Sequence, residues 1–470
     1  MRNLVLAPEA LVTAAAVLLL ILGRMARLPG NARRYMPALA VLVTLVALGI
    51  ELWAGATLGT FFGGALLQDR FALFMKAAAL VAAAIAISTA DWGAEDSVSV
   101  GTAMPLLCAL GVMVVASAGD VVGLWAGLEL AAVSAVVMVS LRRQDLGLRL
   151  LVVGGIASAL VLLGLAFLYA TTGSPELSGI RQALIGTQAT LPLAIPILLL
   201  LSGLAIRAGA GPFLAATRPA DVGGSPIGAG LGLGMVAVAS AAVALKLAAA
   251  MLPVAELYSP YLEFVAAVAM LGGGAAALAA RTARSRLAYL AAGQMGWVLA
   301  GLATHYRAGL GASLFLLGAF AVAATCGPAV LGRGDGAVHA IMGLGTLRPA
   351  RAAGLALAML SLAGAPPLAG FFGELAVAAA LAQGRQFGLL TVGLIGAVMS
   401  AVAVVGSLHL MYLQNPPEDA RRGPAAALPS MTRFSTTGAA VLCLVIAAYG
   451  VFGSPIMGLA DQGAEALGLH

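Results

Sequence analysis

The chain has 470 residues, of which 61% are hydrophobic and 9% are charged, and its mean hydropathy is +1.04. A water-soluble chain carries charges on about a quarter of its residues, so this composition excludes a soluble enzyme or binding protein. The formal net charge of +6 comes from arginines spread over short spacers rather than gathered in the basic stripe of a nucleic-acid-binding protein, and no nucleic-acid partner is expected.

The apolar runs predict fourteen membrane crossings, taking about twenty apolar residues for each. Small residues dominate them, as in membrane helix bundles, and ten-residue alternation typical of barrels is not seen. The first run is preceded by Glu9 and followed by arginines, the reverse of a cleaved signal peptide, so we expect a retained helix. The predicted crossings lie near residues 4–22, 36–55, 72–90, 101–118, 121–141, 147–170, 191–215, 226–250, 260–280, 286–303, 308–331, 352–382, 387–413 and 435–453. An all-α integral membrane fold in contact with the lipid bilayer follows.

The arginine distribution predicts the orientation of these crossings. Seventeen arginines fall in odd-numbered loops, whereas five fall in the N-terminal stretch and the even-numbered loops. Loops on the cytoplasmic side are enriched in Arg and Lys. An even number of crossings places both termini on one side, and we expect that side to face away from the cytoplasm.

Two predicted crossings are interrupted by glycine and proline. Gly211 and Pro212 fall in the seventh, and Pro366 and Pro367 fall in the twelfth. Such breaks free backbone groups that need polar partners, and they usually line a cavity, although a kink with only a packing role is the alternative. The breaks lie five crossings apart, so their helices run in opposite directions, as in inverted repeats of transporters. The expected units are residues 1–100, a first repeat 101–250, a second repeat 251–413 and a last helix with a short tail, 414–470.

Four ionisable residues fall deep within predicted crossings: Glu129, Arg207, Lys246 and Glu374. Lys76 and His409 lie less deeply. Each unpaired charge costs about 2.5 to 3.5 kcal/mol on insertion scales, so each needs a reason. We expect Glu129 to pair with Arg207, either to pass protons or as a static ion pair that fixes helix register. Arginine keeps its proton, so Arg207 holds a carboxylate ionised but cannot itself relay.

The roles of the other two deep residues stay open. Lys246 is one of two lysines in the chain, and a buried ammonium loses its proton readily, which suits a proton carrier. It also lies near the end of its crossing, so reaching out to the membrane surface is the alternative. Glu374 follows the second break, where it is either a titrating group or a solvated carboxylate at a helix end.

Cofactor and metal sites are not expected on this chain. Cys108, Cys326 and Cys443 lie in apolar stretches without CxxC or CxxH spacing, the four histidines are scattered, and no phosphate-binding loop or catalytic triad appears.

Five segments in chain order carry a resemblance to a known family. They are residues 62–76 with Asp69 and Lys76, residues 124–130 with Glu129, residues 149–174, residues 287–296, and residues 360–371 with the double proline. On a plan of fourteen crossings, this set resembles the antiporter-like subunit N of the bacterial respiratory NADH:quinone oxidoreductase, complex I.

The resemblance implies a central axis of buried Glu and Lys residues, in which Glu129 matches the key glutamate of the family. The expected bases are changed. Arg207 and Arg149 stand where lysines are expected. The lysine of the eighth crossing is expected near Val238, but Lys246 lies about two turns further on. Glu374 replaces a lysine, and Gln294 replaces a histidine. The resemblance thus implies the family fold with a proton path that is rewired or lost.

The implied function is that of a subunit in the membrane arm of a proton-translocating NADH:quinone oxidoreductase in a bacterial inner membrane, with both termini periplasmic. NADH, FMN, iron–sulfur clusters and quinone are then expected on partner subunits, and no redox or hydrolytic site on this chain. The alternatives are the equivalent subunit of a membrane-bound hydrogenase or of a multi-subunit cation/proton antiporter, a stand-alone secondary transporter, and a structural scaffold.

Overall fold

The structure is a computed structural model, which describes residues 5–24, 35–54, 58–90, 92, 98–187, 190–217, 225–332, 341–416 and 433–468. Several loop arginines that contribute to the orientation prediction lie outside these ranges, namely Arg2, Arg27, Arg33, Arg34, Arg218, Arg333, Arg421 and Arg422.

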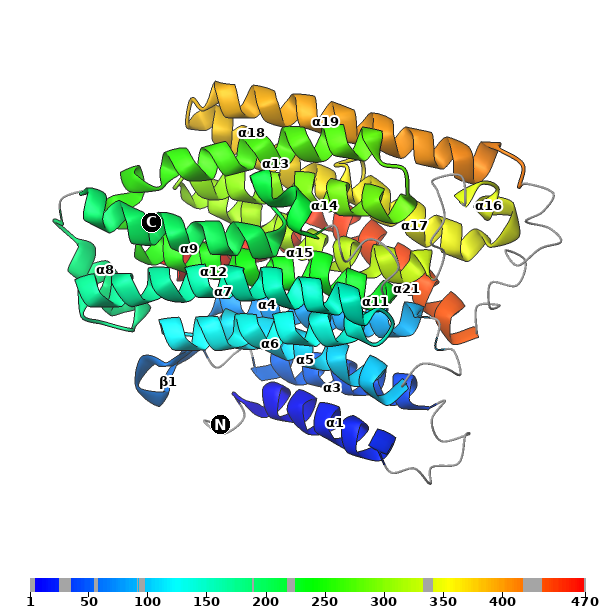
Figure 1. Cartoon of the computed structure of the whole chain (residues 1–470), viewed down its shortest axis with the longest axis horizontal. Coiled ribbons are helices and arrows are strands. Elements are labelled where there is room, and N and C mark those ends of the chain that lie inside the picture. The colour runs from blue at the N-terminus through cyan, green and yellow to red at the C-terminus, as the bar shows by residue number, and fades with distance from the viewer. Residues whose placement is uncertain are drawn as a thin grey trace.

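Long helices lie side by side and form nearly the whole described chain (Figure 1). In chain order they are α1 (Ala7–Arg24), α3 (Met36–Ala54), α4 (Arg70–Thr89), α5 (Val98–Ser117), α6 (Val121–Ser140), α7 (Gln144–Thr172), α9 (Leu191–Ala208), α12 (Ala237–Ala250), α13 (Ser259–Ala279), α14 (Ala283–Ala303), α15 (Arg307–Leu331), α17 (Pro349–Leu362), α18 (Ala369–Gln383), α19 (Phe387–Leu408) and α21 (Arg433–Val451). Short helical segments extend three of them: η3 (Gly211–Thr217) follows α9, α11 (Pro226–Gly230) and the π-helical η4 (Leu231–Val236) lead into α12, and the π-helical η7 (His409–Leu413) follows α19.

Twelve helices in the described ranges are long and apolar enough to cross a membrane. The two further predicted crossings correspond to α14, which carries Arg284 and Arg286 in its first turn, and to the short helices α17 and α18 on either side of a break. The membrane-helix fold is therefore confirmed, and the count of fourteen crossings stays a prediction.

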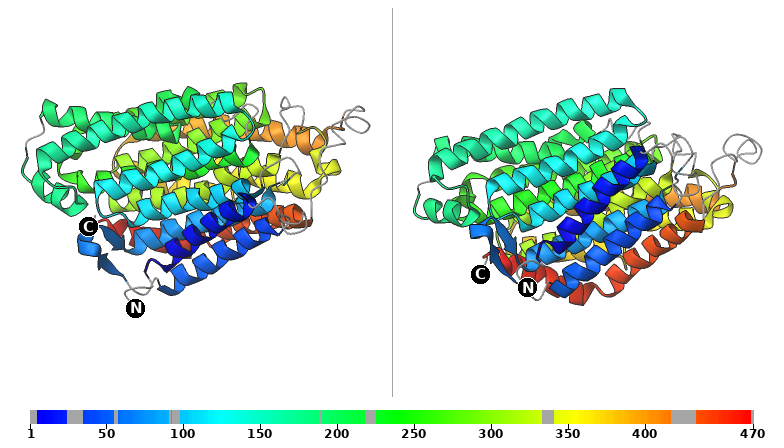
Figure 2. Two further views of the ribbon diagram at one scale, coloured as in Figure 1. Left: turned by 60° about the horizontal axis from the view of Figure 1, so that its bottom comes forward. Right: turned by 90° about the horizontal axis from the view of Figure 1, so that it is seen from below.

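The centre of the bundle is formed by α12 and α15, whose apolar windows are almost fully buried. α15 packs against α4, α14, α17 and α18, while α12 packs against α9 and α5. α1, α3 and α4 lie side by side along one face, and the two ends of the described chain lie toward the same end of the bundle (Figure 2).

Three small elements were not expected from the sequence. A hairpin of two three-residue strands, β1 (Gly59–Phe61) and β2 (Leu66–Gln68), joins α3 to α4. α8 (Leu177–Leu184) follows α7, and α22 (Gly453–Ala466) continues the chain beyond α21 and packs on α15 and α4. Each is too short or too weakly apolar to predict a crossing, and α16 (Leu344–Leu347) is shorter still.

Helix ends in the bundle are closed by polar side chains. Asp69 accepts a hydrogen bond from the backbone N–H of Ala72 at the start of α4, and Asp120 does the same for Gly123 at the start of α6. Arg286 of α14 is buried and donates to the carbonyls of Ala277 and Ala280 at the end of α13, and to the Ala403 carbonyl and Ser407 hydroxyl of α19. Arg286 thus ties the end of α13 to α19 through four hydrogen bonds.

Glycines allow α5 and α6 to approach closely. A Cβ atom on Gly127 of α6 would lie 2.7 Å from the Gly111 carbonyl oxygen and 2.8 Å from the Val115 nitrogen of α5. These are backbone atoms, so they cannot move aside without shifting a helix.

Replacing Gly127 by alanine should separate α5 from α6 and lower the free energy of unfolding by about 1 to 3 kcal/mol, the usual cost of overpacking. The measurement is thermal unfolding of the purified protein in detergent. Gly155→Ala on α7 is the matched control, because its Cβ would meet nothing within 4 Å. An equal melting temperature for the two variants would contradict the close packing of α5 on α6.

Candidate functional site

The predicted ion pair between Glu129 and Arg207 is present and joins α6 to α9. A guanidinium nitrogen of Arg207 contacts Glu129 Oε1 and also lies 3.2 Å from the Gly154 carbonyl oxygen of α7. Ser158 Oγ of α7 donates to the same Glu129 oxygen at 2.5 Å, and Trp125 Nε1 donates to Ser158 at 3.1 Å. The Arg207 side chain is 3% exposed and that of Glu129 is 25% exposed. The Glu129 carboxylate of α6 is therefore held by a permanent cation from α9 and a hydroxyl from α7.

The break after α9 fixes the position of Arg207. α9 ends at Ala208, and Gly209 and Gly211 both adopt positive φ angles, 63° in each case. A Cβ on Gly211 would lie 2.8 Å from Val265 Cγ1 of α13, so both backbone conformation and space favour glycine there. Because Arg207 lies in the last turn of α9, its charge also faces the negative end of the helix dipole. The helix break predicted at Gly211 and Pro212 is confirmed.

A cavity of about 90 Å³ adjoins Arg207 between α6, α7, α9 and η4. Its lining includes Gly154, Gly232, Leu233 and Val236, and Arg207 is its charged member. A buried water needs about 10 to 15 Å³ and polar partners, so there is room for several waters beside the guanidinium. Arg207 supplies the only polar side chain among the described residues that line this cavity.

The second predicted break is also confirmed, between α17 and α18. Residues 363–368 separate these helices and include Pro366 and Pro367, which are exposed and joined by a cis peptide bond. Glu374 lies in the second turn of α18, is 8% exposed, and contacts the backbone at Gly364, where any side chain would collide with the carboxylate. Among the described residues, no ion pair joins Glu374 to a base. It is not a solvated carboxylate at a helix end.

Gln294 of α14 lies beside the break between α17 and α18 and contacts the end of α17. Its Nε2 donates to the Ser361 carbonyl oxygen at 2.9 Å, in the last turn of α17. Its Oε1 is buried and has no hydrogen-bond partner among the described groups. A Cβ on Gly370 would lie 2.8 Å from Gln294 Nε2, so α18 also approaches this amide closely. Glu374 and Gln294 therefore border one break, while Arg207 and its partner Glu129 lie at the other.

Lys246 lies inside the bundle rather than at its surface. The residue is 2% exposed, its Nζ donates to the Ala118 carbonyl oxygen at 2.7 Å, and the same nitrogen lies 5.5 Å from the centre of the Phe71 ring. The loop after α5 and the start of α4 cover the Lys246 ammonium. Burial raises the pKa of Asp69, and the positive charge of Lys246 acts in the opposite direction.

Lys76 is much deeper than the sequence suggested, and its partners were missed. It is 0% exposed, and its Nζ lies 2.5 Å from Glu9 Oε1, 2.8 Å from Gln68 Oε1 and 3.8 Å from Glu51 Oε1. Glu51 lies within the predicted crossing 36–55, so the criterion that selected Glu129 would have found it. Glu9 was considered only as a flanking charge.

Two predicted secondary residues are not brought to either break. Arg149, at the start of α7, and His409, at the start of η7, are both exposed in the structure. No group of three or more His, Cys, Asp or Glu side chains within the described ranges has an arrangement that could hold a metal ion.

The family model described as NADH:quinone oxidoreductase/Mrp antiporter, TM, matches residues 118–400, which is more than half of the chain. The chain belongs to this family. Subunit N of the NADH-quinone oxidoreductase of Granulibacter bethesdensis is 30% identical over 99% of each chain. A chain of respiratory complex I from Thermus thermophilus has a TM-score of 0.80 at 24% identity, covering 97% of this chain and 99% of that one. A chain of the Mrp complex from Dietzia sp. has a TM-score of 0.83 at 18% identity, covering 99% and 97%.

The resemblance to subunit N is therefore confirmed over nearly the whole length, and the solved structures share the fold. The part matched by the antiporter family model contains Glu129, Arg207, Lys246, Gln294 and Glu374. Lys76 and its acidic partners precede it.

Removing one member of the Glu129–Arg207 pair should destabilise the protein. Glu129→Gln leaves the buried guanidinium without a carboxylate, which should lower the free energy of unfolding by about 3 kcal/mol. Arg207→Gln should cost less, because Glu129 is partly exposed, and the double variant should cost less than the sum of the two. Thermal unfolding of the single and double variants gives the coupling energy.

The exposed pair Arg307–Glu465, at 2.9 Å, supplies the control for this double-mutant cycle. Its side chains are 44% and 47% exposed, so Glu465→Gln should change the free energy of unfolding by less than about 1 kcal/mol. A coupling energy between Glu129 and Arg207 as small as that of the exposed pair would contradict their ion pair.

Proposed function

We infer that this chain is a membrane-arm subunit of a proton-translocating NADH:quinone oxidoreductase in which the proton axis between the two helix breaks is interrupted. The full-length relatives, which are named as subunit N of that enzyme, support the first part. The second part depends on the packing between the breaks.

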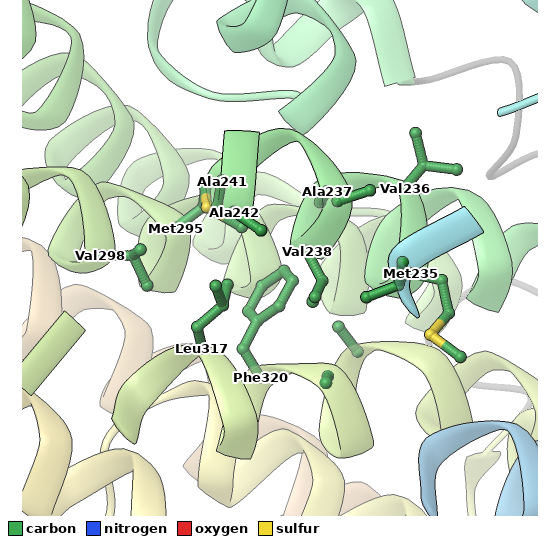
Figure 3. Packing of buried hydrophobic residues seen from close by; sticks show 14 of the residues in the cluster. Met235, Val236, Ala237, Val238, Ala241, Ala242, Met295, Val298, Leu317 and Phe320 are labelled. Carbon is green, nitrogen blue, oxygen red and sulfur yellow. The ribbon is translucent and has the colours of Figure 1, made fainter. Parts of the chain in front are cut away.

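The packing around Val238 is the observation that carries the proposal. Val238 of α12 is 0% exposed and lies beside Leu317 and Phe320 of α15, with Met295 and Val298 of α14 nearby (Figure 3). The family resemblance places a lysine near this position. A proton needs a chain of polar groups or waters, and the side chains of these five residues provide no polar group. The apolar contacts thus separate the Glu129–Arg207 pair from Gln294 and Glu374.

The replacement of the expected lysines and histidine also favours an interrupted proton axis. Arg207 pairs with Glu129 but, as an arginine, does not release a proton at accessible pH, so the pair is a poor relay. Gln294 has no titrating group. Lys246 is buried beside Ala118 and Phe71, toward the start of α4, and is separated from the expected position by about two helical turns.

Several finer features belong to the same proposal. The chain has fourteen crossings in a bacterial inner membrane with both termini periplasmic, and its units are residues 1–100, the inverted repeats 101–250 and 251–413, and residues 414–470. Its partners are other membrane-arm subunits. NADH, FMN, iron–sulfur clusters and quinone reside on partner subunits, and this chain carries no redox or hydrolytic site.

The Mrp neighbour supports only a shared fold, at 18% identity, so a subunit of a cation/proton antiporter is the less favoured function. The membrane-bound hydrogenase subunit, the stand-alone transporter and the structural scaffold have no specific observation in their favour. Identification of the proteins that purify with the chain separates these functions, because flavin and quinone-site subunits, a nickel hydrogenase and small antiporter subunits exclude one another.

The proton-to-electron ratio of the reconstituted complex tests the interrupted axis. Glu129→Gln and Glu374→Gln should leave the ratio at the parent value wherever the complex assembles, because neither carboxylate then lies on a continuous path. Glu465→Gln, on an exposed face, controls for handling of the membranes. A large loss of pumping from either axis variant, with intact assembly and NADH oxidation, would overturn the interruption and favour a rewired path.

A further inference from the structure

A group of ionisable residues lies outside the antiporter repeats, among the first three helices. α1 packs on α3, α3 packs on α4, and the hairpin β1–β2 joins the last two (Figures 1 and 2). Their shared interior contains Glu9 of α1, Glu51 of α3, Gln68 of β2 and Lys76 of α4, which we name the N-terminal charge cluster. The family model begins at residue 118, so it does not describe these residues.

The N-terminal charge cluster is closed to solvent. Glu9 is 8% exposed, Gln68 is 2% exposed, and Glu51 and Lys76 are fully buried. The Lys76 ammonium contacts oxygens of all three other members, and Gln68 Nε2 donates to Glu51 Oε1 at 2.6 Å. Each donor of the cluster therefore has an acceptor.

By contrast, the cluster has carboxylate oxygens that lack a hydrogen-bond donor. Glu9 Oε2 and Glu51 Oε2 are buried and have no hydrogen-bond partner among the described groups. With both carboxyls ionised, two negative charges face one ammonium and the cluster has a charge of −1. A buried charge without a partner costs several kcal/mol, so one further positive charge is needed.

Within the described part of the chain, neighbouring charges do not supply it. Asp69 and Lys246 lie close enough to interact electrostatically with Lys76, but they carry opposite charges and cancel one another. Arg70 is exposed and lines a separate cavity beside Leu52 and Phe74.

The helices packed around the cluster contribute no compensating base. α5 and α11 contain no acidic or basic residue, and Arg24 lies at the opposite end of α1. The other ionisable side chains on the elements packed against α1, α3 and α4 are Cys108 on α5, Arg307 and Cys326 on α15, Arg433, Cys443 and Tyr449 on α21, and Asp461 and Glu465 on α22. Arg307 pairs with Glu465, and Arg433 lies at the first residue of α21.

We propose that the N-terminal charge cluster is a proton-binding site, which holds one exchangeable proton on the Glu9–Glu51 carboxyl pair. Glu51 Oε2 accepts the proton from a solvent hydronium ion and becomes a carboxylic acid: one O–H bond of hydronium breaks, one O–H bond forms on Glu51, and water is left. The charge of the cluster changes from −1 to neutral. Glu51 is the favoured position, because Lys76 contacts Glu9 at 2.5 Å but lies 3.8 Å from Glu51. A metal cation would need the centre of the oxygens, where the Lys76 ammonium already lies.

Infrared difference spectroscopy of the purified whole complex tests the proposal, through the carbonyl stretch of protonated carboxylic acids and its shift in D₂O. Glu51→Gln should remove the signal of one protonated carboxyl at neutral pH. Glu9→Gln should also remove the signal of one protonated carboxyl. In that variant the Glu51 carboxylate and the Lys76 ammonium balance each other's charge, so no bound proton is needed. Lys76→Met should add one, because two carboxyls then lack a cation.

The same infrared spectra provide a control variant and a result that would contradict the proton-binding site. Glu465→Gln alters an exposed, ion-paired carboxylate and should leave the protonated-carboxyl signal unchanged. If Glu51→Gln prevents assembly, Glu9→Gln and Lys76→Met still give opposite expected changes. A signal that stays at the parent intensity in the assembled glutamine variants would mean that both carboxyls are ionised, and would overturn the proton site. Because this readout does not depend on pumping, its failure is distinct from a failure of the proposed function.

Discussion

An ionised side chain inside this apolar bundle needs an opposite charge or a carbonyl oxygen within hydrogen-bonding distance, because neither lipid nor packed alanine and leucine can solvate it. The placement of the buried charges follows from this requirement. Arg207 reaches Glu129, Lys76 reaches two glutamates and a glutamine, and Lys246 reaches the end of α5. Each contact joins helices that are separate in sequence, so the charges also determine which helices are neighbours.

Sequence patterns predicted the helices, the two breaks and the Glu129–Arg207 pair, because each depends on a local property. Apolar runs of sufficient length define a membrane helix, and glycine with proline interrupts it. Glu129 and Arg207 were each conspicuous as a lone charge in an apolar run, and each had few possible partners. The hydrophobic pattern could therefore identify the pair without knowledge of the helix arrangement.

The N-terminal charge cluster was not predicted, because its members come from three helices and a hairpin whose mutual positions are not encoded in periodicity. Gln68 lies on a three-residue strand, which is too short for an alternating pattern. Glu9 precedes the first long apolar run, so its sequence context is that of a helix end. Its burial depends on the packing of α1 on α3 and α5. For the same reason, the depth of Lys76 and Lys246 depended on which neighbouring segments cover them.

Arg286 has a further consequence for how the chain enters the membrane. It belongs to a predicted cytoplasmic loop, where any positive charge helps to set helix orientation. In the folded bundle, however, its planar guanidinium donates to the ends of α13 and α19 at once, which a lysine with a single nitrogen does not match. A lysine at this position would therefore keep the positive charge of the loop but would not replace the hydrogen bonds that tie α13 to α19.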